Sequence, residues 1–319
     1  MNHMSVKIKP IALISIAVLS LFLPLLFSRY FLHLTIFMMI TAIAVLGLGI
    51  LGASGQISSA QGAFYGIGAY TCALLCTRLG CSYWVALIAV ILIACVVGVL
   101  VGLPAIKVSG LYLVMTTLGI NEIIYIIMMN SVSFTGGPQG VSQIPPIRFL
   151  FFSLDTMKKF YYLAFAMLVI FTFLSNRILK SRLGLFFISI KSSDIASRMN
   201  GVNVLKTKLV AFVISAVYGG IAGSLYASYI GYIHPDNFKT DVSVLFLTMS
   251  IFGGQRSVLG MICATIILTF ATEYFRFIGD YRMIAYGLVL VLGMMFMPEG
   301  IGSKIKDFQH RRLVKRGAV

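Results

Sequence analysis

One apolar stretch of the sequence carries polar side chains at the spacing of a helix face. In residues 110–130, Thr117, Asn121 and Tyr125 recur every four residues. Glu122 borders the face that they would share in a helix. Hydroxyl, amide and carboxylate groups are costly inside a membrane unless a pore or a neighbouring helix receives them. Thr117, Asn121 and Glu122 are therefore candidates for a solute pathway, and the alternative that Glu122 is pinned to a neighbouring helix stays open.

A second group of polar residues precedes a glycine-rich stretch. Residues 55–70 read GQISSAQGAFYGIGAY, with Gly62, Gly66 and Gly68 at helical spacing. Small residues let helix backbones approach closely in lipid, so close helix packing is the favoured use of these glycines. The amide and hydroxyl groups ahead of them need polar partners at membrane depth. They add three candidates to the pathway, which are Ser58, Ser59 and Gln61.

The sequence contains no catalytic or metal-binding pattern. Its Gly-rich segments lack the lysine of a phosphate-binding loop, its four histidines share no spacing, and no nucleophile elbow or C-x-x-C pair occurs. The five cysteines lie in or beside apolar stretches, which indicates small core residues rather than disulfides. We therefore expect a protein that is not an enzyme, that binds no metal or cofactor, and that leaves ATP hydrolysis to other chains.

The elements that position these side chains are predicted to be membrane helices. Of the 319 residues, 59% are hydrophobic and 11% charged, and the mean hydropathy is +0.99. A helix needs about 20 apolar residues to cross a bilayer. The apolar runs are continuous and do not alternate like the strands of a membrane β-barrel. They predict a single domain over residues 1–319, an all-α polytopic bundle of about ten transmembrane helices. The predicted spans are residues 11–27, 31–51, 60–77, 83–105, 110–130, 160–176, 208–232, 242–254, 257–276 and 283–298.

Two places in this series have alternative interpretations. Residues 11–27 follow Lys7 and Lys9 as the core of a signal peptide does, although no small-residue cleavage site comes after them. Gly253 and Gly254 interrupt an apolar stretch, and they mark either a break between two spans or a re-entrant turn.

The net charge of +16 comes from basic residues gathered between and after the predicted spans. Residues 177–208 hold seven Lys or Arg against one acid, and residues 299–319 form a basic tail. The positive-inside rule predicts that both segments and the N-terminus are cytoplasmic. Six spans before residue 177 and four after residue 208 agree with that topology. The charge is thus explained without nucleic acid as a partner.

The basic segment of residues 177–208 is also predicted to contain a short amphipathic helix. Ile195 and Met199 lie one helical turn apart, and Asp194 and Gly201 are typical of a helix start and end. A helix of this kind, held between two spans, suits docking into a groove of a soluble partner. The alternative is a helix that lies on the anionic lipid surface.

At this helix the sequence resembles the permeases of ATP-binding cassette importers, whose coupling loop has the pattern E-A-A-x-x-x-G. Ala196 and Gly201 match its Ala and Gly, and Asp194 stands in for its acid. The surrounding residues 181–227 resemble branched-chain amino acid ABC permeases of the LivM type. The GQxSxxxGAFxGIGAY-like, TGGPxGV-like and late GG-containing segments of that family are matched in order by residues 55–70, 135–141 and 253–260.

The resemblance implies an ABC importer permease fold in the cell inner membrane. It implies translocation of branched-chain amino acids or related small polar solutes. The implied partners are two cytoplasmic ATPase subunits that bind ATP, a second permease subunit and an extracytoplasmic substrate-binding protein. The turn-rich loop of residues 131–159 is extracytoplasmic by topology, so it is a candidate docking surface for that binding protein or a structural lid. The residues assigned to coupling with the ATPases are Asp194, Ile195, Ala196, Met199 and Gly201.

The sequence departs from the family pattern at several positions. Ser59, Ala60 and Gln61 stand where Leu, Gly and His are usual, Arg256 replaces a Gly, and the coupling helix lacks the usual charged cluster. These differences concern the substrate more than the fold. Urea, short amides and other amino acids are therefore alternative substrates.

Two other classes of protein also stay open. An ion-coupled secondary transporter would work without an ATPase and would need several intramembrane acids, whereas only Glu273 joins Glu122 in the predicted spans. A channel or scaffold subunit would have the same hydropathy, but it leaves the patterned cytoplasmic loop without a role.

Overall fold

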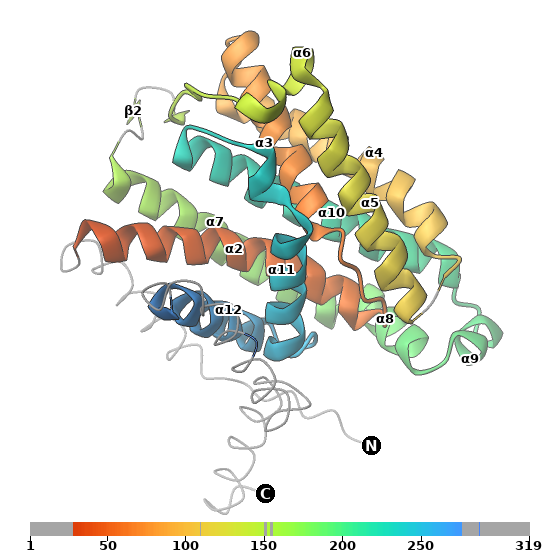
Figure 1. Ribbon diagram of the computed structural model, residues 1–319. Helices are drawn as coiled ribbons and strands as arrows, with labels where there is room; N and C mark the ends of the chain where they lie inside the picture. Colours follow the sequence, from red (N-terminus) through yellow and green to blue (C-terminus); the bar gives the residue numbers. More distant parts are fainter. Residues whose placement is uncertain (1–27, 109, 150–151, 154–155, 276–286, 288–319) are drawn as a thin grey trace, which may run out of the picture.

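The computed structural model describes residues 28–108, 110–149, 152–153, 156–275 and 287, and this part of the chain is largely helical (Figure 1). The long helices are α2 (Arg29–Ala53), α3 (Gln61–Arg78), α4 (Tyr83–Ala105), α5 (Leu111–Asn130), α7 (Met157–Lys180), α10 (Val204–Ile230), α11 (Thr240–Gly253) and α12 (Val258–Tyr274). The short elements are α6 (Val132–Thr135), η1 (Gly137–Gln139), α8 (Arg182–Ser192), α9 (Asp194–Met199) and η2 (Pro235–Phe238). Strands β1 (Arg148–Phe149) and β2 (Phe152–Ser153) pair antiparallel, which is a small departure from the all-α prediction.

Eight predicted spans coincide with helices, namely α2 to α5, α7 and α10 to α12. The predicted spans at residues 11–27 and 283–298 lie outside the described residues, apart from Gly287. Five described helices, α2, α4, α5, α7 and α10, are long and apolar enough to cross a membrane. Helices α3, α11 and α12 have 18, 14 and 17 residues. The count of ten spans therefore stays a prediction.

The centre of the bundle is formed by α2 and α10. Helix α10 packs against α2, α3 and α4, and α2 also contacts α7, α11 and α12. Glycines allow the closest contact, between α3 and α10: a Cβ on Gly68 would lie 2.0 Å from the carbonyl oxygen of Gly220, and one on Gly223 would lie 1.9 Å from that of Tyr65. Close packing is thus confirmed as the use of Gly68.

The outer helices present apolar side chains to the surroundings. Exposed residues of α4 and α5 include Val85, Ile88, Leu92, Val96, Leu100, Met115, Ile123 and Ile126, and those of α7 include Val169, Ile170 and Phe173. Large apolar surfaces of this kind are rare on a soluble monomer. They fit helices that contact lipid or another membrane subunit.

The bundle has two ends, with α8 and α9 at one end and α6 and η1 at the other (Figure 1). At the α8–α9 end, Nζ of Lys191 donates to the carbonyl oxygen of Gly52 at 3.4 Å and to Oε1 of Gln255 at 3.3 Å. These contacts place the end of α2 and the α11–α12 turn beside α8. At the α6 end, an isolated β-bridge joins Val141 to Ile233 in the connection from α10 to α11.

Helix α11 is short, and the helical segment to which it belongs is interrupted after Gly253. Its 14 residues span about 21 Å, which is less than the ~30 Å hydrocarbon core of a bilayer. It begins beside the middle of α5, where Thr240 contacts Asn121, and the predicted break follows it, because Gly254 adopts a φ of 82°. Residues 231–239, which include η2, form the connection that precedes α11. Residues 54–60 form a second non-helical segment, between α2 and α3.

Candidate functional site

Three segments bring polar groups together beside the middle of α5. They are the end of the non-helical stretch 54–60 with the start of α3, one face of α5, and the stretch that leads from η2 into α11. We call this contact region the polar seam. It consists of Ser59, Gly62, Thr117, Asn121, Glu122, Tyr125, Asp236, Lys239, Thr240 and Ser243.

The buried part of the polar seam is centred on Asn121. Its Oδ1 accepts a hydrogen bond from Oγ of Ser243 at 2.9 Å, and its Nδ2 donates to Oγ1 of Thr240 at 3.3 Å. The backbone N–H of Gly62 donates to the same Ser243 hydroxyl at 2.7 Å. One amide side chain thus links α5 to α11 and, through Ser243, to α3. Asn121 is fully buried, which makes its hydrogen bonds costly to lose.

Thr117 lies one turn before Asn121 on the same buried face of α5, as the spacing predicts. The N–H of Ser59 donates to Oγ1 of Thr117 at 2.9 Å. The non-helical stretch before α3 is therefore tied to the face of α5 that also meets α11.

The exposed part of the polar seam holds its charges. Oε2 of Glu122 accepts from Oγ1 of Thr240 at 2.8 Å, and the hydroxyl of Tyr125 donates to Oδ1 of Asp236 at 2.9 Å. Nζ of Lys239 lies 3.1 Å from the same Asp236 oxygen. Hydrogen bonds from Lys239 and Tyr125 hold the pKa of Asp236 below its usual value. These two donors favour the ionised form of the Asp236 carboxyl, which lies in η2.

The polar seam is the candidate for a solute pathway. From Thr117 to Tyr125 it follows α5 for about 12 Å. Backbone outside the α-helices, in residues 54–60 and 231–239, leads to it. Such backbone is tolerated at membrane depth only where protein covers it or where it lines a water-filled cavity. Discontinuous helices of this kind form the solute sites of many transporters.

The two remaining pathway candidates lie elsewhere. Nε2 of Gln61 donates to the carbonyl oxygens of Ala44 at 2.8 Å and Ser215 at 3.3 Å, and its Oε1 accepts from the Ser215 hydroxyl at 2.9 Å. Gln61 therefore joins α3 to α2 and α10, away from α5. Oγ of Ser58 accepts from the N–H of Ala60 at 3.2 Å, within its own turn. The structure brings Ser59, Thr117, Asn121 and Glu122 together.

Sequence reasoning missed the contribution of residues 236–243. Asp236, Lys239 and Thr240 precede the predicted span at 242–254 and have the composition of a surface turn. The available signal was a charged and hydroxyl-rich stretch just ahead of a short apolar run that two glycines end. A short, interrupted run of this kind points to a discontinuous helix.

Two polar side chains near the seam have unused hydrogen-bonding capacity. Both amide atoms of Gln56 and the hydroxyl of Ser59 are buried without a hydrogen-bond partner among the described residues. Such groups are rare in native structures because leaving them unpaired is costly. The stretch 54–60 can therefore accept new polar partners when its surroundings change.

At the other end of the bundle, α9 starts and ends where the sequence predicts. Asp194 is its first residue, and the preceding Ser193 accepts a hydrogen bond from the N–H of Ala196 at 3.2 Å. Gly201 follows the helix with a φ of 77°. Its N–H donates to the carbonyl oxygen of Arg198, which closes the helix in the manner of a Schellman motif.

The apolar side chains of α9 are exposed. Ile195 is 73% exposed and Met199 is 83% exposed. On the opposite side, the buried Ser197 hydroxyl lies 2.7 Å from that of Ser189 in α8, and Lys208 of α10 pairs with Asp194 at 2.5 Å. Contacts with α8 and α10 thus fix one side of α9, and its apolar residues face outward on the other side.

Lys191 connects this end of the bundle to the broken segments. Its contacts with Gly52 and Gln255 reach the residues just before stretch 54–60 and the turn after α11. Desolvation and the nearby charge of Arg256 lower the pKa of Lys191 from its usual value.

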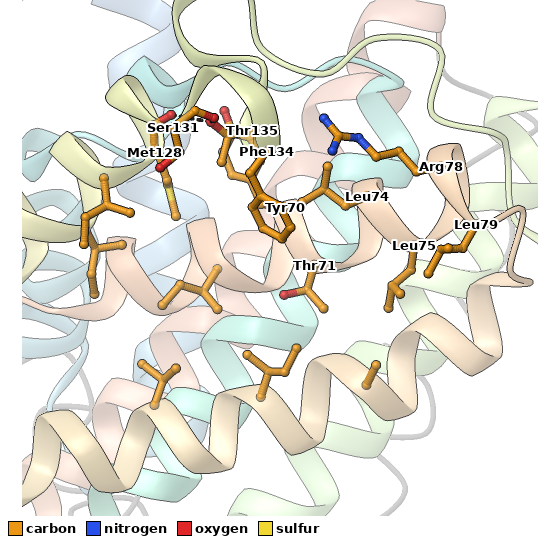
Figure 2. A pocket seen from close by; sticks show the side chains of 16 residues that line it. Tyr70, Thr71, Leu74, Leu75, Arg78, Leu79, Met128, Ser131, Phe134 and Thr135 are labelled. Carbon is orange, nitrogen blue, oxygen red and sulfur yellow. Dashed lines mark hydrogen bonds between the residues drawn. The ribbon is translucent and has the colours of Figure 1, made fainter.

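An apolar cavity of about 660 Å³ lies among α3, α4, α5 and α6 (Figure 2). Two of its polar groups bond to the chain itself: Oγ1 of Thr135 donates to the carbonyl oxygen of Met128 at 2.6 Å, and Arg78 donates to that of Ser133 at 2.9 Å. The buried hydroxyl of Tyr70, which also lines the cavity, has no hydrogen-bond partner among the described residues. The polar seam, rather than this cavity, is the candidate site for a polar solute. The other lining residues include Ile67, Leu74, Leu75, Ile93, Val97, Ile124, Ile127 and Phe134.

Apolar helices around a polar seam at broken segments define a multi-pass membrane protein of the permease class. Residues 30–297 match the family model of the permease component of branched-chain amino acid transport systems. The chain is 35% identical, over 91% of its length and 74% of the relative's, to the high-affinity branched-chain amino acid transport system permease protein LivM of Escherichia coli K12. The chain therefore belongs to the family of branched-chain amino acid ABC transporter permeases.

More distant relatives extend this comparison. A probable branched-chain amino acid transport permease protein LivM of Methanocaldococcus jannaschii is 24% identical over 66% of this chain and 61% of its own length. The ribose import permease protein RbsC of Escherichia coli K12 is 23% identical over 36% of this chain and 38% of its own length. No solved structure matches the chain.

Proposed function

We propose that this chain translocates branched-chain amino acids across the cell inner membrane as one permease subunit of an ABC importer. The observation that carries the proposal is its 35% identity to a LivM permease along nearly the whole chain. The polar seam supports it by supplying hydrogen-bonding groups along α5 inside an apolar bundle.

The test is purification of the tagged chain from its native host, with its companions identified by mass spectrometry, followed by uptake assays in liposomes. We expect two ATPase subunits and a second permease, and uptake of L-leucine that needs ATP and a binding protein. Uptake by the chain alone, abolished when the proton gradient is dissipated, would instead make it a secondary transporter.

Coupling to the ATPases is assigned to α9, with Asp194, Ile195, Ala196, Met199 and Gly201. Ile195 and Met199 supply an exposed apolar surface that a groove on an ATPase can bury. Asp194 and Gly201 hold the helix at its two ends. ATP-driven movement of the ATPases would displace α9 and reorient the helices attached to it. In this assignment the α8–α9 end, both termini and the tail of residues 299–319 are cytoplasmic.

The opposite end of the bundle is then extracytoplasmic and is proposed to receive the substrate-binding protein. In the loop of residues 131–159, Gly136, Gly137 and Gly140 adopt positive φ, and the ring nitrogen Nε2 of His234 lies 2.7 Å from the carbonyl oxygen of Pro138. A rigid surface of this kind suits docking. Removal of residues 135–141 is expected to weaken binding-protein docking, and unchanged docking would exclude the loop as its receptor.

A further inference from the structure

Glu122 differs from the other acids of the long helices. The long helices described here contain Glu122, Asp241 and Glu273 as their acids. Asp241 stands in the first turn of α11, where the helix dipole favours a negative charge. Glu273 accepts a hydrogen bond from the hydroxyl of Tyr30 at 2.6 Å and lies next to the end of α12. Glu122 is the twelfth of the 20 residues of α5, which places it near the middle of a span.

The negative charge of Glu122 is not matched by a cation within the described part of the chain. Its contact is the neutral hydroxyl of Thr240, which in turn accepts from Asn121. The lysine in the polar seam, Lys239, pairs with Asp236 instead. Salt bridges in the described residues involve other acids, namely Asp194 and Asp236.

An exposed carboxylate at this depth requires a positively charged partner or water. Charged groups inside a membrane face a bundle interior or a water-filled pathway and pair with one another. Glu122 is exposed, and it belongs to the polar seam that leads from η2 to stretch 54–60. Lys239 offsets the charge of Asp236, while Asp241 directly follows Thr240 in the sequence. The remaining local excess of acids favours a cation over an anion.

We propose that Glu122 binds the α-ammonium group of an amino acid as it passes through the permease. The proposal rests on the proposed function, since a branched-chain amino acid carries such a group and a sugar does not. One or two of the ammonium N–H groups can donate to the carboxylate oxygens, and charge-assisted hydrogen bonds of this kind are about twice as strong as neutral ones. Thr240 and Asn121 orient the carboxylate from behind through the chain of hydrogen bonds described above. Glu122 is thus a specificity-determining residue for zwitterionic substrates.

The test compares Glu122→Gln with wild type in the complete importer, reconstituted in liposomes with its second permease, ATPases and binding protein. Glutamine keeps the shape of the side chain and can still accept from Thr240, but it removes the charge. We expect L-leucine uptake to fall by about tenfold or more, because a hydrogen bond to a charged group is lost from the pathway. Binding-protein-stimulated ATP hydrolysis should stay within about twofold of wild type, because the coupling end is untouched. Uptake by Glu122→Gln equal to that of wild type would overturn the proposal.

Two further variants separate this role from a structural one. Glu122→Asp keeps a carboxylate and is expected to retain most of the uptake, whereas Glu273→Gln removes a charge from another helix and should leave uptake unchanged. If Glu122→Gln instead lowers the yield of the complex of two permeases, Glu122 pairs with a cation of the second permease and the proposal is wrong. If the wild-type importer takes up no branched-chain amino acid, it is the proposed function that fails.

Discussion

Helix α9 and the polar seam both place side chains against the usual pattern of burial, but in opposite ways. Helix α9 leaves apolar side chains bare, with Met199 83% exposed, although it belongs to a strongly basic segment. The polar seam buries hydrogen-bonding groups in an apolar bundle, with Asn121 at its centre. Exposed apolar residues mark surfaces that bind a partner. Polar residues inside a membrane protein cost free energy, and their presence there points to a function. The difference fits the proposed roles, in which α9 contacts a partner through its surface and the polar seam contacts the solute inside the bundle.

A bulky charged side chain on α9 is expected to have the largest effect on uptake. Ala196 is exposed, so Ala196→Arg leaves the fold of the chain intact while placing a charged side chain in the proposed interface with the ATPase. We expect L-leucine uptake to be abolished while membrane insertion, measured by the amount of chain in washed membranes, is unchanged. Gly201→Asp is expected to have the same effect, by altering the left-handed turn that ends α9.

A matched variant places the same side chain outside α9. Ser192 is an exposed residue at the end of α8, and Ser192→Arg should retain uptake close to that of wild type. Normal uptake by Ala196→Arg would count against the coupling role of α9.

The second prediction concerns the buried part of the polar seam. Asn121→Ala removes the hydrogen bonds to Ser243 and Thr240 and leaves their hydroxyls short of partners. We expect the free energy of unfolding to fall by about 1–3 kcal/mol and L-leucine uptake to fall several-fold. The thermal stability of the purified complex and its uptake rate measure the two effects.

The control is another amide in a long helix. Asn176 of α7 donates to the carbonyl oxygen of Thr172 within its own helix, and within the described part of the chain it bonds to no other helix. Asn176→Ala should change stability and uptake little. An Asn121→Ala variant as stable and active as this control would show that the seam neither joins the helices nor lines the route.

The third prediction tests whether α9 and the polar seam are connected. Lys191, at the end of α8, donates hydrogen bonds to Gly52 and Gln255. Gly52 lies just before residues 54–60, and Gln255 lies in the turn between α11 and α12. Lys191→Met is expected to lower uptake a few-fold while ATP hydrolysis continues, so that fewer solute molecules enter for each ATP consumed. Lys191→Arg preserves a cation and should restore most of the coupling. An unchanged ratio of uptake to ATP hydrolysis in Lys191→Met would remove Lys191 as a connection.

The sequence predicted the regular parts of this architecture well. The polar face of α5 with Thr117 and Asn121, the start of α9 at Asp194 and its end before Gly201 all follow from helical periodicity and capping chemistry, which are local. The approach of Ser243 to Gly62 joins residues 181 positions apart, and no local pattern encodes it. The position of Gln61, which bonds to α2 and α10 at the centre of the bundle and not to α5, was missed for the same reason.

The smallest effect is expected at the ion pair behind α9. Nζ of Lys208 lies 2.5 Å from Oδ2 of Asp194, and the Asp194 side chain is 41% exposed. Partly exposed ion pairs contribute no more than about 1 kcal/mol to stability. Lys208→Met should therefore lower uptake by less than about twofold, since Ser193 and Gly201 still define the helix ends. Raising the salt concentration should lower wild-type uptake toward that of Lys208→Met, because salt screens the pair. A loss as large as that of Ala196→Arg would mean that the charge of Lys208 itself meets the ATPase, and the interface would then extend from α9 onto α10.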